Sequence, residues 1–160
     1  MPFDASIEAA IELGSAGRRK KPEAGSEHET KKGDVTMKFM MIVKHKEGQG
    51  FPPKELFDAI GKMSEEAAKA GTMLGNGGLA PTAAGARVKL SNGKITVIDG
   101  PFTEAKEIIG GYAQFELKSK QEAVEGAVQF MELHKKYWPG WEGETEVRQM
   151  MGPEDCVPKS

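Results

Sequence analysis

The residues from Phe39 to Val43 form an apolar run that constrains the fold more than any other segment of this 160-residue chain. A lysine bounds the run on each side, and its apolar side chains do not alternate with polar ones. Successive side chains of a β-strand point to opposite faces of a sheet, so such a strand has to be covered on both faces. The run therefore predicts a central strand of a sheet.

Two segments show the spacing of an amphipathic helix. The first follows Pro52-Pro53, where proline is tolerated because the N–H groups of a first helical turn are unpaired anyway. Gly71 is well placed to end this helix in a left-handed conformation. Its apolar stripe consists of Leu56, Ile60, Met63, Ala67 and Ala70. The second helix opens at a capping box of Ser119 and Glu122. Its stripe consists of Ala123, Ala127, Phe130, Met131 and His134.

A hairpin is predicted between the two helices. Ser91-Asn92-Gly93 is flanked by the predicted strands 87–90 and 94–98, and Asn-Gly accepts the positive φ that a tight hairpin turn requires. The segment 72–79 is ambiguous, and we interpret it as a short strand followed by a Gly-rich turn.

The order of elements indicates the fold class. Residues 111–117 and 145–151 alternate between apolar and polar side chains, which adds a strand before and after the second helix. The order β-α-(β)-β-β-β-α-β predicts an α+β fold, most simply a ferredoxin-like split βαβ with two helices on one face of an antiparallel sheet. The first strand is apolar on both faces, so the other face needs a cover as well. A second copy of the chain is the simplest cover, and we expect a homodimer with its sheets face to face.

Composition narrows the classes of partner. The chain has 24 acidic and 22 basic residues and a formal charge of −2, which argues against nucleic acid. No apolar run approaches the roughly 20 residues that span a bilayer, and no secretory signal is recognised, so no membrane partner is expected. The single cysteine, Cys156, excludes an internal disulfide and favours the cytoplasm. No Cys/His cluster has metal-ligand spacing, and no cofactor is expected.

The chain is expected to have three parts. Residues 1–36 hold almost no large apolar side chain after Gly14, which predicts disorder. Lys31 to Thr36 could also derive from a ribosome-binding sequence before Met37, which would make 1–36 an artefact of the gene model. Residues 37–151 form the folded domain, and 152–160 form a flexible C-terminal tail.

Asp99-Gly100-Pro101-Phe102 follows directly on the predicted hairpin. Ile95, Val97 and Asp99 share one face by the two-residue period of a strand. The carboxylate therefore lies at the end of an apolar stripe, where partial burial would suit acid/base chemistry. The same motif is also ordinary turn chemistry, in which the aspartate accepts backbone hydrogen bonds. The residues alone favour this second interpretation.

The segment 99–112 resembles the DGPF branch of the YCII-related proteins, and so do the Met-Lys-Phe-Met-Met start at 37–41 and Glu146-Val147-Arg148. The resemblance covers nearly all of 37–151 and implies a dimeric ferredoxin-like α+β barrel. Some relatives are thought to use a His-Asp pair, with the histidine in the first helix. This sequence has no histidine between Lys46 and Leu133, which departs from that pattern.

His45 is the candidate to replace the missing histidine. It ends the first predicted strand and would move a proton while Asp99 orients its ring. A solvated histidine between Lys44 and Lys46 is the simpler interpretation. His134, on the stripe of the second helix, is expected to be a packed core histidine.

The candidate ligand-binding residues surround the Asp-Gly-Pro-Phe motif. They are Gly100, Pro101, Phe102, Lys106 and Tyr112. Two functions remain open on the sequence. One is a small enzyme that performs an elimination, isomerisation or similar proton transfer on a small organic substrate, with Asp99 and His45 as catalytic residues. The alternative is a noncatalytic homodimer that binds a metabolite or a regulatory partner.

Overall fold

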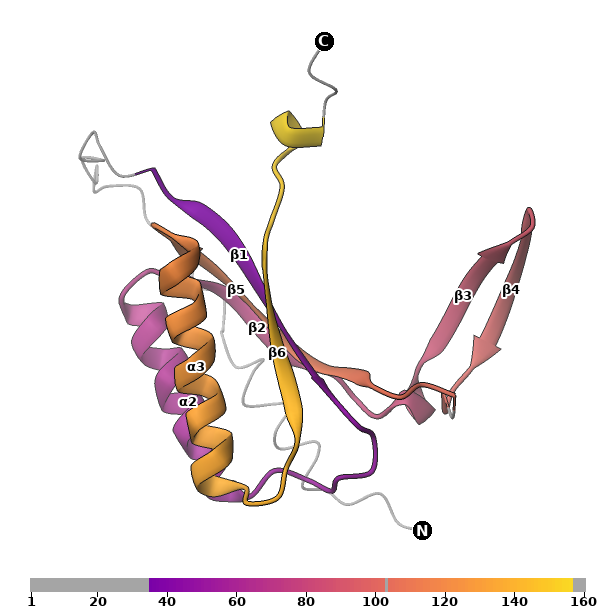
Figure 1. Cartoon of the computed structure of the whole chain (residues 1–160), viewed down its shortest axis with the longest axis horizontal. Coiled ribbons are helices and arrows are strands. Elements are labelled where there is room, and N and C mark those ends of the chain that lie inside the picture. The colour runs from indigo at the N-terminus through magenta and orange to yellow at the C-terminus, as the bar shows by residue number, and fades with distance from the viewer. Residues whose placement is uncertain (1–34, 103, 157–160) are drawn as a thin grey trace, which may run out of the picture. The chain divides into compact units, whose positions relative to one another are not determined.

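The computed structural model describes residues 35–102 and 104–156 (Figure 1). The elements in chain order are β1 (Met37–His45), α2 (Lys54–Lys69), β2 (Met73–Gly78), the 3₁₀ turn η1 (Thr82–Ala84), β3 (Ala86–Ser91), β4 (Lys94–Asp99), β5 (Ile108–Leu117), α3 (Lys120–Tyr137), β6 (Gly143–Gln149) and the 3₁₀ turn η2 (Pro153–Cys156). Of the expected extension 1–36, residues 1–34 lie outside the described residues. The expected tail 152–160 is described only as far as η2. No helix in the described ranges is long and apolar enough to cross a membrane.

Four strands form one antiparallel sheet in the order β2-β5-β1-β6. Strand β1 is central and pairs with β5 on one side and with β6 on the other. Helices α2 and α3 both lie on one side of this sheet (Figure 1). This is the ferredoxin-like split βαβ arrangement, so the predicted fold class and the predicted central strand are both confirmed.

The core lies between the sheet and the helices. Phe39 of β1 is directly opposite Phe115 of β5, and these rings pack with Met41 against Ala123 and Ala127 of α3. The two alanines are small enough to let the helix approach the rings closely, and burying such large apolar side chains is the main source of stability. The helical stripe predicted for α3 therefore faces the sheet as expected.

The opposite face of the sheet is not covered by a helix of the described residues. Met40 and Ile42 alternate with the core residues of β1 and are half-buried on this face. Ile42 is directly opposite Tyr112 of β5. Lys44 follows on the same face, with its Nζ 2.8 Å from Glu144 and 2.6 Å from Glu146. This face is apolar in its centre and charged along β6.

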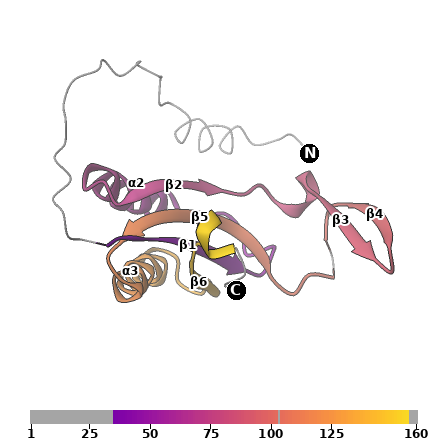
Figure 2. The same cartoon turned by 90° about the horizontal axis from the view of Figure 1, so that it is seen from above.

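Strands β3 and β4 form a separate two-stranded sheet. This hairpin stands away from the helices and the four-stranded sheet (Figures 1 and 2). Asn92 and Gly93 turn the chain with φ of 51° and 74°, as predicted from the Asn-Gly signal.

One face of the hairpin carries four apolar side chains. The pairs Val88↔Val97 and Leu90↔Ile95 are two residues apart along each strand, so all four side chains point the same way. We call these four residues the apolar ladder. All of them are largely exposed: Val88 by 71%, Val97 by 66%, Leu90 by 70% and Ile95 by 67%. The described residues of a single chain therefore leave the ladder open.

Three strand boundaries differ from the sequence prediction. The Gly-rich part of 72–79 is not a turn but continues β2, because Gly77 leaves room for the ring of Tyr112 across the sheet. Strand β5 begins at Ile108, three residues before the expected start. Strand β6 lies two residues earlier than expected, at Gly143–Gln149. None of these differences changes the order of the elements.

Candidate functional site

The Asp-Gly-Pro-Phe loop packs against η1 at the base of the hairpin. The Gly100 N–H donates to the carbonyl of Gly85 at 2.8 Å, and the Phe102 N–H donates to Oγ1 of Thr82 at 3.1 Å. A Cβ atom on Gly100 would overlap the carbonyl oxygen of Thr82. Only glycine fits at this position. The loop therefore closes the base of the hairpin by packing tightly against η1.

Glu47 joins this closure from the loop after β1. Its carboxylate accepts hydrogen bonds from the N–H of Thr82 at 2.7 Å and from the hydroxyl of Thr82 at 2.6 Å. The hydrogen bond from the Thr82 hydroxyl contributes most to holding the pKa of Glu47 below its usual value, and the bond from the Thr82 N–H comes next. The charge of His45 lowers this pKa as well. Sequence reasoning missed both Glu47 and Thr82, because 35 residues separate them and neither belongs to a motif.

Phe102 and Arg87 pack on each other beside this closure. The guanidinium carbon of Arg87 lies 4.1 Å from the centre of the Phe102 ring, which is the geometry of a cation–π contact. The ring also borders Gly85, where a Cβ would lie 3.6 Å from it. Phe102, expected to contact a ligand, is engaged by the protein itself in this structure.

Asp99 is the last residue of β4 and lies directly opposite Ala86. By the two-residue period it shares a face with Ile95 and Val97, as predicted. The residue is exposed, and it lines neither of the two cavities described for the chain. The carboxylate therefore stands beside the apolar ladder, on a face that the single chain leaves open.

His45 is fixed by its neighbour in sequence. Its Nδ1 lies 2.8 Å from the carbonyl oxygen of Lys46, and because a carbonyl only accepts, Nδ1 carries the hydrogen. The ring packs against Gly110, where a Cβ would overlap it, and its centre is 6.1 Å from that of Trp141. Nε2 of His45 lies against the backbone of Gly110 and has no hydrogen-bond partner among the described residues. No hydrogen bond joins His45 to Asp99 among them either.

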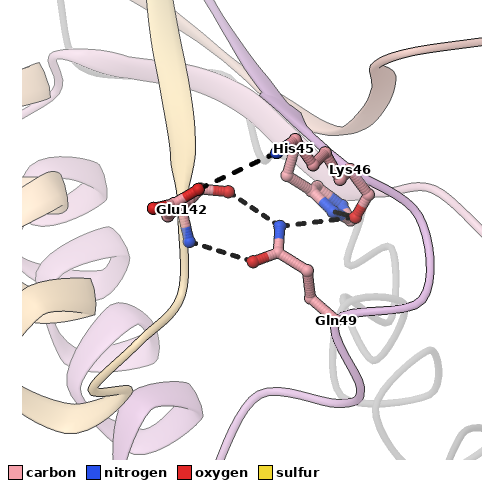
Figure 3. Close-up of polar contacts among 4 residues, drawn as sticks. All are labelled: His45, Lys46, Gln49 and Glu142. Atoms are coloured by element: carbon pink, nitrogen blue, oxygen red, sulfur yellow. Dashed lines mark hydrogen bonds and ion pairs between the residues drawn. The ribbon is translucent and has the colours of Figure 1, made fainter.

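Gln49 ties the loop after β1 to the loop between α3 and β6 (Figure 3). Its Nε2 donates to the carbonyl of Glu142 at 2.7 Å, and its Oε1 accepts from the N–H of Glu142 at 3.0 Å. Lys46 adds an ion pair of 3.9 Å to the Glu142 carboxylate. The side chains of His45 and Trp141 are therefore held on connected loops. Gln49 was not predicted, because its partner lies 93 residues away.

The remaining candidates lie apart from these contacts. Lys106 is exposed in the loop before β5. Tyr112 is 38% exposed on the sheet face without helices, with its ring against Gly77. Gly100 and Pro101 belong to the closure of the hairpin base. In the part of the chain that the structure covers, no group of three or more His, Cys, Asp or Glu side chains could hold a metal ion.

A family model for the YCII-related domain matches residues 37–130. The chain belongs to the YCII-related family. The matched stretch runs from β1 into α3 and includes the hairpin and the Asp-Gly-Pro-Phe loop. Membership of the YCII-related family, predicted from the sequence, is thereby confirmed. No curated protein matches the sequence.

This YCII-related domain has no histidine in its first helix. The resemblance places that histidine roughly at Ile60 and Gly61, and α2 holds no histidine anywhere along its length. A His-Asp pair in this chain would therefore have to draw its histidine from another element, and His45 at the end of β1 is the candidate that the sequence offers.

Replacing Glu47 with glutamine should make the stability of this YCII-related domain less sensitive to acid. The pKa of Glu47 is lower in the folded chain than in the unfolded chain, so its contribution is complete above the unfolded value and is lost as the pH falls through the folded value. Thermal unfolding should be followed from neutral pH to below about 4.3, the ordinary pKa of glutamate. We expect the melting temperature of Glu47→Gln to fall less steeply with decreasing pH than that of wild type.

The control for this experiment is Glu125→Gln, which changes an exposed glutamate of α3. It should follow the wild-type pH profile. If Glu47→Gln also follows that profile, the Thr82 hydrogen bonds do not stabilise the charged form of Glu47.

Proposed function

We propose that this YCII-related protein is a homodimer of the DGPF branch that binds a small organic molecule beside the Asp-Gly-Pro-Phe loop. Asp99 serves as its acid/base group and His45 as the partner in proton transfer. One observation carries the proposal: the apolar ladder is exposed on the same face of the hairpin as Asp99.

Four adjacent apolar side chains on a projecting hairpin differ from the single apolar residues found on most protein surfaces. A contiguous patch of this kind usually marks a contact with another molecule. We favour a second copy of the chain as the molecule that covers the apolar ladder. The chain also has an apolar sheet face, around Met40 and Ile42, and no helix of the described residues covers it. Each copy of a twofold dimer offers both surfaces to the other.

Covering the apolar ladder would also remove water from one side of Asp99. A carboxylate at the edge of an apolar contact is in a suitable environment for acid/base chemistry. His45 would act through Nε2, since its Nδ1 hydrogen is bonded to the Lys46 carbonyl. The Asp99 carboxylate would accept a proton from the substrate, and Nε2–H of the His45 imidazolium would donate one, which is what an elimination or an isomerisation requires.

The second candidate function is a noncatalytic dimer that binds a ligand or a regulatory partner. The packing of Gly100 on Thr82 and of Phe102 on Arg87 favours it, because these contacts give the Asp-Gly-Pro-Phe motif a structural task. In that case Asp99 contributes to binding but not to chemistry.

A thermal-shift screen of small organic acids and hydroxylated compounds tests the ligand site. Compounds that raise the melting temperature of wild type should raise that of Asp99→Asn by less than about half as much, because a weaker Kd reduces the stabilisation by mass action. Asp58→Asn, which changes an exposed aspartate of α2, should respond like wild type. Equal shifts in Asp99→Asn would refute a ligand site at Asp99.

The same variant separates the two functions once a compound that turns over is found. Loss of an acid/base group costs typically about 100-fold or more in rate. A rate near wild type in Asp99→Asn would exclude the catalytic role and leave the binding module.

A further inference from the structure

A cavity of about 420 Å³ lies between the end of α3 and the start of β6. Its lining includes Met131, His134, Trp138 and Trp141. These side chains take no part in the proposed site at Asp99. A volume of this size is within the range of pockets for small molecules, and aromatic and apolar walls are typical of such pockets.

Aromatic rings form one wall of the cavity. The ring centres of His134 and Trp141 are 4.5 Å apart, and those of Trp138 and Trp141 are 6.0 Å apart. Phe130 packs on the other side of His134, with ring centres 4.4 Å apart. Trp138 and Trp141 are the only two tryptophans of the chain. Their faces offer a stacking surface for a planar molecule.

His134 presents one ring nitrogen without a protein partner. The residue is 6% exposed, and its Nδ1 lies 3.0 Å from the carbonyl oxygen of Phe130. Because a carbonyl only accepts, Nδ1 carries the hydrogen and Nε2 of the neutral ring is an acceptor. No described residue bonds Nε2. No fully buried side-chain nitrogen or oxygen of the described residues lacks a partner, so Nε2 must reach solvent, and the cavity is the opening that His134 lines.

The charge state of His134 supports this role. Burial lowers the pKa of His134, the hydrogen bond to Phe130 opposes this, and the charge of His45 acts with burial. The ring is therefore neutral near pH 7 and offers the lone pair of Nε2. His134 is 6% exposed, so a donor that binds Nε2 inside the cavity forms a hydrogen bond sheltered from most of the solvent.

The wall of the cavity is held in place by the rest of the fold. A Cβ on Gly143 would overlap the ring of Trp141, so this position accepts only glycine. Gln49 fixes the neighbouring residue Glu142 through two hydrogen bonds (Figure 3). A site that is already formed loses little free energy to ordering when a ligand binds.

We propose that this cavity binds a small, uncharged aromatic molecule that carries an O–H or N–H donor. The ring packs against the tryptophans, and the donor bonds Nε2 of His134. An uncharged ligand is favoured because the cavity lining holds charges of both signs, with Lys135 3.5 Å from Glu132. Asp99 does not line this cavity, although His45 lies beside its wall at Trp141. The proposal does not depend on acid/base chemistry at Asp99.

Phenol and anisole test the proposal, because they differ in one feature: anisole has no O–H donor. Binding is followed by fluorescence excited selectively at tryptophan and by the indole N–H signals in NMR, which report on Trp138 and Trp141 alone. We expect phenol to shift both signals and to bind about three- to tenfold more tightly than anisole, the effect of one hydrogen bond.

His134→Phe keeps an aromatic ring but removes the acceptor. This variant should bind phenol and anisole equally, whereas Lys120→Gln, at the opposite end of α3, should keep the wild-type preference. Equal affinities of the two probes in wild type, or no binding of phenol, would overturn the proposal. A preference for phenol that survives in His134→Phe would overturn it too. If His134→Phe does not fold, the comparison of the two probes in wild type still decides.

Discussion

Gly100→Ala should lower the free energy of unfolding by at least about 2 kcal/mol, as overpacking against fixed atoms does. The added Cβ would overlap the carbonyl oxygen of Thr82 and lie 3.1 Å from that of Gly85. Both are backbone atoms, which cannot move aside by a change of rotamer. The Gly100 N–H would also be displaced from the Gly85 carbonyl to which it donates. Urea denaturation of both proteins measures the difference.

Gly61→Ala is the matched control for this prediction. Gly61 lies within α2, and a Cβ there would meet nothing within 4 Å. An alanine in a helix interior is more stable than a glycine by about 0.5 to 1 kcal/mol, so the same substitution should have opposite signs at the two positions. A Gly100→Ala protein as stable as wild type would show that the hairpin base is not closed as described.

Ile95→Lys should weaken the proposed dimer by about 100-fold or more. Burying an isoleucine contributes about 1.5 to 3 kcal/mol, and a twofold interface loses this contribution twice. Ile95 is 67% exposed in the single chain, so the folded monomer itself should be little affected. Sedimentation equilibrium at several concentrations measures the dissociation constant.

Thr96→Lys is the control for Ile95→Lys, because it introduces the same side chain at the next residue. Thr96 pairs with Lys89 and points to the other face of the hairpin. We expect its dissociation constant to remain near that of wild type. Equal effects of the two lysines would contradict an interface on the apolar ladder.

Local signals account for the parts of the fold that the sequence predicted. Asn92 and Gly93 set the hairpin turn by their own backbone preferences. Ser119 caps α3 by accepting from the N–H of Glu122, three residues away. The apolar run of β1 identified the central strand because apolar side chains on both of its faces are visible in the order of residues. Each of these features depends on neighbours in sequence.

Contacts between distant residues account for what was missed. The Glu47 carboxylate meets Thr82 only after the hairpin base has closed, and Gln49 meets Glu142 across the ends of two strands. His134 was assigned to the core from its place on the helical stripe. It is buried as predicted, but a periodic pattern cannot tell whether one ring nitrogen of a buried histidine faces a cavity. That the hairpin forms its own sheet was likewise not predicted, since strand pairing is set by the tertiary fold.

Sedimentation equilibrium of the full-length wild-type chain tests the central claim most directly, namely that a second copy covers the apolar ladder beside Asp99. We predict the mass of two chains at micromolar concentrations, falling toward one chain only on strong dilution. The mass of a single chain at every concentration would contradict the dimer and, with it, the enclosed setting that acid/base chemistry at Asp99 requires.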